Sequence, residues 1–450
     1  MSLRLFHRLD NAKTQYYHFK AVIVAGMGLF TDAYHLYSIT PIMTMLAVAL
    51  LGAAIGQLIF GRLGDLAGRK RLYGLALMLI MAGSIGCGFS IGTPKGYILG
   101  SLGFFRFLVG VGIGGDYPLS ATIISEYANK RVRGTFMAAV FSMQGFGILA
   151  SSVVTMTVCK IFSRIYHPST IDPKPKEADI AWRLILMLGV IPAVLTFYWR
   201  MKMPETARYT ALVENNVLQA TEDMERVLDM SHCQIAEGCF LQPSQWTQPT
   251  SSYPLFSKQF FLYHGRNLLA CSTTWFLLDI VFYSYPVLQS KIYFKDQLDE
   301  DTAFDAAFKI ARLQAIMACS SMIPGCIAAF FLIDRIGRLI IQAVGFVLMA
   351  IVYFSIRVPY DKYRQHHPSA LFIMYGLTSF FANCGPNTTT TTCHGIAGAA
   401  GKVGAIIGVL MASLGTGVTL IIWGGVCTAG MVATSMFTKE TKGTSLEENE

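Results

Sequence analysis

The chain has 450 residues, of which 53% are hydrophobic and only 14% are charged, whereas an ordinary soluble domain has about 25% charged residues. The charged residues gather between long apolar runs, which excludes a soluble globular enzyme, a disordered chain and a disulfide-rich secreted scaffold. The net charge of +9 comes from short basic clusters between these runs, which is typical of cytoplasmic loops rather than of a nucleic-acid surface. The sequence predicts an all-α polytopic membrane protein that lies in a lipid bilayer and binds no nucleic acid.

A helical membrane span needs about 20 mostly apolar residues, and twelve runs fit that requirement in two sets of six. The predicted spans are 21–46, 47–63, 72–92, 98–124, 133–160 and 181–201, followed by 260–290, 304–332, 336–356, 369–390, 395–411 and 412–436. Lys and Arg in the short loops alternate so that both termini are expected in the cytoplasm. The expected parts are a cytoplasmic N-terminus at 1–20, a six-helix bundle at 21–201, a central cytoplasmic loop at 202–259, a second six-helix bundle at 260–436 and a cytoplasmic tail at 437–450.

Three junctions between predicted spans lack a polar turn. Residues 21–60 are nearly uncharged, and the same is true at 388–395 and near Leu414. Backbone cannot turn inside the hydrocarbon core of a bilayer without hydrogen-bond partners. We therefore expect loop segments to be missing at these three junctions.

The two sets of spans share short sequence repeats. Asp-x-x-Gly-Arg occurs at 65–69 and again at 334–338, and each half closes with a similar phrase, PETAR at 204–208 and KETKG at 439–443. Two similar halves of six spans are the plan of the major facilitator transporters. We interpret the charges in and near the repeat as a cytoplasmic lock between helices that governs conformational switching. The residues of this predicted lock are Asp65, Arg69, Glu126, Asp334 and Arg338.

An ionisable side chain in a membrane span costs about 2.5–3.5 kcal/mol on insertion scales and indicates function by default. Asp279 is the clearest case, because Trp275 lies four residues before it and Tyr283 four residues after it. This spacing places an indole, a carboxylate and a phenol on one helical face. The alternative is an aromatic stripe that packs on a neighbouring helix, with a paired aspartate.

Other polar residues within the spans allow two interpretations each. Asp116, next to Tyr117, is either a proton relay or the partner of a basic residue. Gln144 and Asn387 are either hydrogen-bond clasps between helices or cavity-lining groups, and the adjacent Gly385-Pro386 favours a broken helix that lines a cavity.

Four more ionisable residues lie within spans: Asp32, His35, Arg106 and Lys402. The two cations either attract an anion or act as structural counter-ions, and a lone histidine is more often a hydrogen-bonded packing residue. The ten cysteines form no CxxC pair. Without a nucleotide loop, a metal-ligand cluster or a nucleophile–base pair in the sequence, we expect neither a cofactor nor an enzyme.

The segment GGDYPLSATIISEYANKRVRG (114–134) closely resembles the hallmark of the proton-coupled phosphate transporters of plants and fungi, a family within the major facilitator superfamily. Four further segments are similar to the plant-type members, so the resemblance covers most of both halves. They are SMQGFG (142–147), TWFLLDIVFYS (274–284), FFANCGPNTTT (380–390) and TCHGIAGAAGKVGAI (392–406).

The resemblance implies roles for individual residues. The residues that it places around phosphate are Tyr117, Gln144, Trp275, Asp279, Tyr283 and Asn387, with Lys402 near the same cavity. Asp279, Asp32 and Asp116 match positions implicated in proton movement. The chain departs from the family at His35, where FTDAYHLYSIT (30–40) replaces FTDAYDLF-like text and removes the second aspartate of a proton route through this span. A PAEIFP-type turn after GPNTTT is also absent.

Physical chemistry supports the same function. Phosphate near neutral pH is a protonated oxyanion, and neutral hydroxyl, indole and amide groups can replace its hydration shell without trapping it. Asp279 would repel the anion when ionised and hydrogen-bond to it when protonated, so that proton binding and phosphate binding favour each other. We expect a proton:phosphate symporter that imports inorganic phosphate across a plasma membrane. The alternatives are a facilitator for another solute, such as a sugar or an organic anion, and a non-transporting phosphate sensor.

Overall fold

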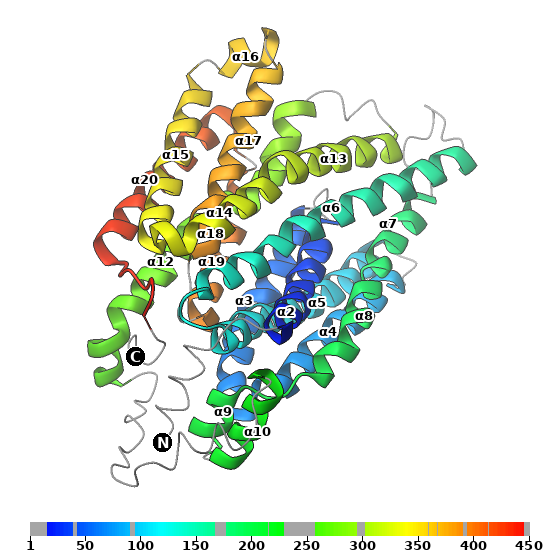
Figure 1. The fold of residues 1–450 in the computed structure, drawn as a ribbon. Helices are drawn as coiled ribbons and strands as arrows, with labels where there is room; N and C mark the ends of the chain where they lie inside the picture. Colours follow the sequence, from blue (N-terminus) through cyan, green and yellow to red (C-terminus); the bar gives the residue numbers. More distant parts are fainter. Residues whose placement is uncertain are drawn as a thin grey trace.

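The computed structural model of the chain describes residues 16–38, 43–90, 95–166, 177–214, 216–228, 257–294, 302–358, 360–366, 368–389, 394–412 and 414–444. All regular elements in these ranges are helices (Figure 1). Nine helical stretches of this described part are long and apolar enough to cross a membrane, and Gly395–Met411 is a shorter apolar helix. The predicted all-α polytopic membrane class is confirmed.

In chain order, the helices are divided into two sets, with a short helical pair between them in the sequence. The first set is α2 (Tyr16–Tyr37), α3 (Met43–Ala67), α4 (Arg69–Gly88), α5 (Lys95–Tyr127), α6 (Arg133–Tyr166), α7 (Glu177–Leu188) and α8 (Val190–Lys202). The central segment contains α9 (Ala207–Leu212) and α10 (Val217–Leu228). The second set is α12 (Lys258–Phe294), α13 (Ala303–Met317), the π-helix η1 (Ala318–Met322), α14 (Ile323–Ile336), α15 (Arg338–Arg357), α16 (Tyr360–His366), α17 (Pro368–Cys384), α18 (Pro386–Thr389), α19 (His394–Met411) and α20 (Thr416–Phe437).

The predicted boundary between the first two spans, at 46/47, is wrong. Helix α2 ends at Tyr37 and α3 already begins at Met43. The uncharged sequence between the two helices hid this boundary, although Pro41 disfavours helical backbone at the residue before it. The junctions at 39–42 and 390–393 lie outside the described residues. At the third junction the chain turns between Met411 and Thr416, where the Leu414 N–H donates to the Met411 carbonyl at 2.9 Å.

Glycines on α19 allow this helix to pack closely against α12. A Cβ at Gly404 or Gly408 of α19 would collide with the carbonyl oxygens of Phe276 and Ile280 on α12. Small residues allow such backbone approach in membrane helices. Because α19 lies directly against α12, Lys402 of α19 comes within reach of the polar face of α12.

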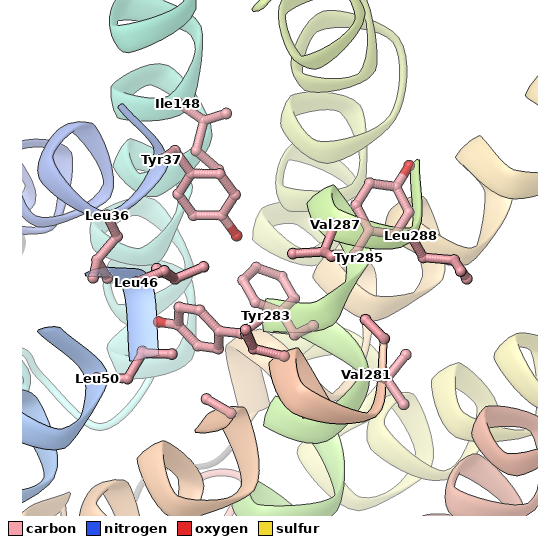
Figure 2. Packing of buried hydrophobic residues seen from close by; sticks show 14 of the residues in the cluster. Leu36, Tyr37, Leu46, Leu50, Ile148, Val281, Tyr283, Tyr285, Val287 and Leu288 are labelled. Carbon is pink, nitrogen blue, oxygen red and sulfur yellow. The ribbon is translucent and has the colours of Figure 1, made fainter. Parts of the chain in front are cut away.

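The two bundles meet along two sets of helices. Helix α3 of the first bundle packs against α19 of the second, and α6 packs against α13 and α14 (Figure 1). Apolar residues from both bundles also form one buried cluster, in which Leu46, Leu50 and Ile148 face Val287 and Leu288 (Figure 2). The space between the bundles is therefore closed by side chains around its centre.

Candidate functional site

The site begins with the polar face of α12. Trp275, Asp279 and Tyr283 occupy successive turns, and each is at most 4% exposed. Lys402 of α19 lies against two of them: its Nζ is 2.9 Å from Oδ2 of Asp279 and 2.8 Å from the Tyr283 hydroxyl oxygen. The ammonium group, which has three N–H donors, thus donates to a carboxylate and a phenol at once.

Aromatic rings surround this ammonium group. Nζ of Lys402 lies 4.2 Å from the ring centroid of Tyr283, 5.4 Å from that of Tyr117 and 5.9 Å from that of Trp275. Each distance is within the range of a cation–π interaction. The Tyr117 ring, which comes from α5 of the first bundle, meets the Trp275 ring edge-on at 5.4 Å. The ring contact therefore joins the two bundles across the site.

The two amides form a second contact between the bundles. Asn387 lies on α18, directly after the break at Gly385 that separates this short helix from α17. Its Nδ2 donates to Oε1 of Gln144 on α6 at 3.4 Å and to Oδ1 of Asn383 at 3.0 Å. Asn383 was not among the predicted site residues, although it lies four residues before Asn387.

All seven residues predicted around phosphate therefore gather between the two bundles. Two come from the first bundle and five from the second, and none is more than 6% exposed. The site is closed to solvent in this conformation, with Lys402 occupying its centre. Their roles in binding stay predictions.

Asp116 lies in a separate, fully buried ion pair inside the first bundle. Its carboxylate accepts two hydrogen bonds from Arg200, at 2.5 Å and 2.9 Å, and both side chains have 0% exposure. The Arg200 guanidinium also stacks over the Tyr73 ring, 3.9 Å from its centroid. A Cβ at Gly28 would collide with both charged groups, so this glycine makes room for the pair.

The structure thus places a basic partner beside Asp116, which is one of the two interpretations left open. Arg200 was not among the predicted site residues, because an arginine near the end of an apolar run is typical of a loop charge that sets orientation. The position of Asp116 within a span nevertheless indicated a basic partner, because a buried carboxylate is costly unless a cation lies beside it.

Asp32 of α2 is buried and belongs to neither ion pair. It is 3% exposed, and neither carboxylate oxygen has a hydrogen-bond partner among the described residues. Both of its oxygens are therefore available to a proton.

His35 and Arg106 are not part of this site. The His35 ring lies 3.2 Å from Oγ of Ser84, inside the first bundle. Arg106 donates from Nη1 to the backbone carbonyl of His35 at 2.9 Å. The two side chains stabilise helix packing on the side of α2 that faces α4, which fits the packing interpretation of the histidine.

The predicted lock consists of two similar arrangements, one in each bundle. In the first, Arg69 lies 3.0 Å from Glu126 and 3.5 Å from Asp65. In the second, Arg338 lies 3.7 Å from Asp334. The first arrangement joins helices of the same bundle, so its part in locking the two bundles stays a prediction.

Two glutamates in the repeated closing phrases complete these arrangements, and the sequence analysis did not assign them a role. Glu205 accepts the N–H groups of Arg69 and Lys70 at 3.2 and 3.1 Å, and Glu440 accepts that of Arg338 at 3.1 Å. Each carboxylate therefore caps the first turn of a helix, where negative charge is favoured. Burial raises the pKa of the Glu205 carboxyl group, and the N–H donors oppose that shift.

Asp334 also makes a contact between the bundles. Its Oδ2 accepts hydrogen bonds from the backbone N–H and the hydroxyl of Thr135, at 2.7 and 2.8 Å. Thr135 belongs to the first turn of α6. One carboxylate of the repeat thus attaches the second bundle to the first.

We expect Asp334→Asn to open this end of the molecule. The substitution removes the negative charge of the carboxylate to which the N–H and the hydroxyl of Thr135 donate. Hydrogen bonds to charged groups contribute about 1.5–3 kcal/mol each. Spin labels at Arg131 and Arg335, both exposed, will report a larger population of long distances. Asp65→Asn is the matched control, because it makes the same change at the equivalent position of the other repeat. A distance distribution in Asp334→Asn equal to that of the wild-type protein would contradict a locking role for Asp334.

Comparisons with known proteins agree with this architecture. The family model described as "Sugar (and other) transporter" matches residues 4–450. The chain is 50% identical to a probable inorganic phosphate transporter 1-9 of Arabidopsis thaliana, with 100% of this chain and 96% of the relative covered. It is 43% identical to a low affinity inorganic phosphate transporter 3 of Petunia hybrida, with 99% and 94% covered. The Arabidopsis alignment runs over 511 positions, so that relative carries residues that this chain lacks.

Solved structures show the same fold at low sequence identity. The structure of the proton:xylose symporter XylE bound to 6-bromo-6-deoxy-D-glucose matches with a TM-score of 0.71 and 19% identity, and covers 96% of this chain and 98% of that one. A partially occluded inward-open conformation of the xylose transporter XylE from E. coli matches with a TM-score of 0.68 and 19% identity, covering 96% and 100%.

Proposed function

Since the chain belongs to the sugar (and other) transporter family and to the family of the plant inorganic phosphate transporters, we propose that it is a proton-coupled symporter that imports inorganic phosphate by alternating access. It is a multi-pass membrane protein with the major facilitator fold and a transporter rather than an enzyme. We place it in a plasma membrane, with both termini in the cytoplasm, from the distribution of Lys and Arg in its short loops.

The observation that supports this function best is the Asp279–Lys402–Tyr283 cluster, buried where the two bundles meet. Asp279 is the counter-ion of Lys402 in this conformation. When Asp279 takes up a proton it loses its charge, and the ammonium group of Lys402 and the hydroxyl of Tyr283 become available to a phosphate oxygen. Phosphate then replaces the Asp279 carboxylate beside the ammonium group of Lys402.

The same geometry supplies the coupling. An ionised Asp279 and a phosphate anion at Lys402 would repel each other at close range in a poorly screened site. Protonation of Asp279 and binding of phosphate therefore favour each other by the same free energy, as linkage requires. Loss of the proton on the cytoplasmic side returns Lys402 to Asp279 and releases phosphate.

Alternating access follows from the way the site is assembled. Tyr117 and Gln144 come from the first bundle, whereas Asn387 and Lys402 come from the second. A rocking motion of one bundle against the other would separate these partners on one side at a time. Asp32 and Asp116 extend the polar path into the first bundle and are proposed to assist proton movement.

The test is uptake of labelled phosphate by the purified protein in liposomes. An inward proton gradient should drive accumulation above the outside concentration, and a protonophore should abolish it. Phosphate uptake that is the same with and without the proton gradient would contradict proton coupling. Phosphate binding without flux would identify a sensor, and inhibition of binding by a sugar or an organic anion at equal concentration would identify another substrate.

We expect Tyr283→Phe and Asn387→Ala each to weaken the apparent affinity for phosphate about two- to tenfold, because each removes a neutral hydrogen-bond group that contributes about 0.5–1.5 kcal/mol. The concentration of phosphate at half-maximal uptake measures this change. Tyr34→Phe is the control, since the Tyr34 hydroxyl donates to the Ile185 carbonyl inside the first bundle at 2.8 Å. Unchanged affinity in both site variants would place phosphate elsewhere.

A further inference from the structure

We propose that Gln57 of α3 is a phosphate-binding residue of the cytoplasm-facing conformation, in which its amide group bonds to phosphate as the ion leaves the site. The inference rests on the proposed function and extends it, because it assigns a contact on the release path. The starting observation is that the Gln57 side chain is buried where the two bundles meet, with 0% exposure, and has no hydrogen-bond partner among the described residues.

The amide group of Gln57 lies against the second bundle. A Cβ added to Gly398 of α19 would lie 2.9 Å from Nε2 of Gln57 and 3.1 Å from its Oε1. A Cβ added to Gly395 would lie 3.1 Å from the Gln57 carbonyl oxygen. Helices α3 and α19 pack against each other here (Figure 1), and the two glycines make room for the main chain and the side chain of Gln57. The amide therefore lies within the contact between the bundles.

Gln57 lies one helical turn from the Asp279–Lys402 ion pair, measured along α19. A Cβ added to Gly401 would lie 2.9 Å from Oδ2 of Asp279, and Gly398 precedes Gly401 by three residues. Residues three apart are neighbours on the same face of a helix, about 4.5 Å apart along its axis. The Gln57 amide and the Asp279 carboxylate therefore follow each other along one face of α19.

The amide lies on the cytoplasmic side of the site in the proposed orientation. Helix α3 continues from Gln57 to Asp65, the first residue of the predicted cytoplasmic lock. On α19, Gly398 is nearer than Lys402 to the start of the helix at His394. This start is cytoplasmic, because the eleventh of twelve spans begins on the same side as the N-terminus. A phosphate ion that leaves Lys402 toward the cytoplasm therefore passes the Gln57 amide once α3 and α19 separate.

Gln57 does not hold the bundles together by a hydrogen bond in this conformation. Asn387 and Gln144 form such a bond between the bundles at 3.4 Å, whereas neither Nε2 nor Oε1 of Gln57 has a partner among the described residues. A buried amide without partners costs free energy, and most buried polar side-chain atoms in native structures are paired. The amide gains partners when α3 moves away from α19, so the closed conformation bears a cost that opening toward the cytoplasm removes.

The chemistry of an amide group suits a contact from which phosphate must leave again. Nε2 of Gln57 can donate to a phosphate oxygen, and Oε1 can accept from the hydroxyl of protonated phosphate. An arginine would hold the same ion by two charge-assisted hydrogen bonds. A neutral amide replaces part of the hydration shell of phosphate without adding a second cation beside Lys402, so the ion can pass on to the cytoplasm.

Gln57→Met tests the inference, because methionine keeps an unbranched side chain and removes the amide. The measurement is exchange of labelled phosphate by the protein in liposomes, oriented with its cytoplasmic face inward. Phosphate is saturating on one side and varied on the other. The inside concentration at half-maximal exchange should rise about two- to tenfold, which is the effect of losing a neutral hydrogen bond. The outside concentration at half-maximal exchange should keep its wild-type value, whereas a merely structural role would shift the two concentrations together.

Gln289→Met is the matched control. Gln289 is another buried amide, 2% exposed, whose Nε2 has no partner among the described residues, but it follows Asp279 by ten residues toward the outer end of α12. Its substitution should leave the inside concentration at half-maximal exchange unchanged. Gln57→Asn keeps an amide on a shorter side chain, and a smaller rise than in Gln57→Met would support the inference.

Two results would overturn the inference. One is a wild-type inside concentration at half-maximal exchange in Gln57→Met, and the other is an equal shift of the inside and outside concentrations in that variant. Failure of the proposed function is recognised separately, since the wild-type protein would then exchange no labelled phosphate or would not accumulate it under a proton gradient.

Discussion

Asp279→Asn is expected to abolish proton-driven accumulation of phosphate while the protein still folds and inserts. The amide that replaces the carboxyl group cannot exchange a proton, so it cannot alternate between repelling the phosphate anion and bonding to it. Its carbonyl oxygen can still accept the hydrogen bond that Lys402 donates to Asp279 at 2.9 Å, which preserves the local packing. The measurement is uptake of labelled phosphate by liposomes against its own concentration gradient.

Two further measurements make this result specific. Exchange of phosphate without a proton gradient should survive in Asp279→Asn, because the neutral amide resembles the protonated carboxyl group in charge and shape. Asp179→Asn makes the same chemical change at a carboxylate outside the site and the lock, whose side chain is 48% exposed, and it should accumulate phosphate like the wild type. Uphill accumulation by Asp279→Asn would remove this residue from the coupling mechanism.

Arg200→Met is expected to destabilise the protein by about 3–5 kcal/mol, because it leaves Asp116 as a buried charge without its partner. Both side chains have 0% exposure, and the pair is joined by two hydrogen bonds. The double variant Asp116→Leu/Arg200→Met should regain most of this loss, since apolar residues often replace a buried ion pair at little cost. The midpoint of thermal unfolding in detergent measures both effects.

The same variants separate the two interpretations of Asp116. If the double variant is stable and still accumulates phosphate, Asp116 serves the structure of the first bundle alone. If it is stable but does not accumulate phosphate, Asp116 takes part in proton movement. A double variant as unstable as Arg200→Met would show that the unpaired charge of Asp116 is not the cause of the instability.

Local spacing predicted the polar face of α12 correctly. Trp275, Asp279 and Tyr283 repeat every four residues, and a continuous helix must carry such residues on one side. The predicted spans that begin at 72 and 336 start within three residues of the helices that begin at Arg69 and Arg338, where charged residues and glycine separate the apolar runs. Between Tyr37 and Met43 the predicted boundary was wrong, because the residues that separate the two helices in the sequence are all apolar or uncharged, and hydropathy does not distinguish them from the spans.

Partners that are distant in sequence could not be predicted in this way. Lys402 and Asp279 are 123 residues apart, and Arg200 and Asp116 are 84 residues apart. Each ion pair forms only where two helices pack closely. Such packing depends on small residues such as Gly28 and Gly401, which lie against the two carboxylates. The capping roles of Glu205 and Glu440 were missed for the same reason, although the repeated phrases around them were visible.

The 14% of charged residues by itself determined that this is a membrane protein, because so few charges cannot cover a soluble surface. Apolar runs and their basic flanks determined the two sets of spans, since burial in lipid depends on local composition. Only the tertiary structure decided which of the few buried charges act together. Asp279 shares Lys402 with Tyr283, Asp116 is held by Arg200, and Asp32 is left with neither. Ion pairing depends on distance between side chains, and that distance is set by helix packing rather than by position along the chain.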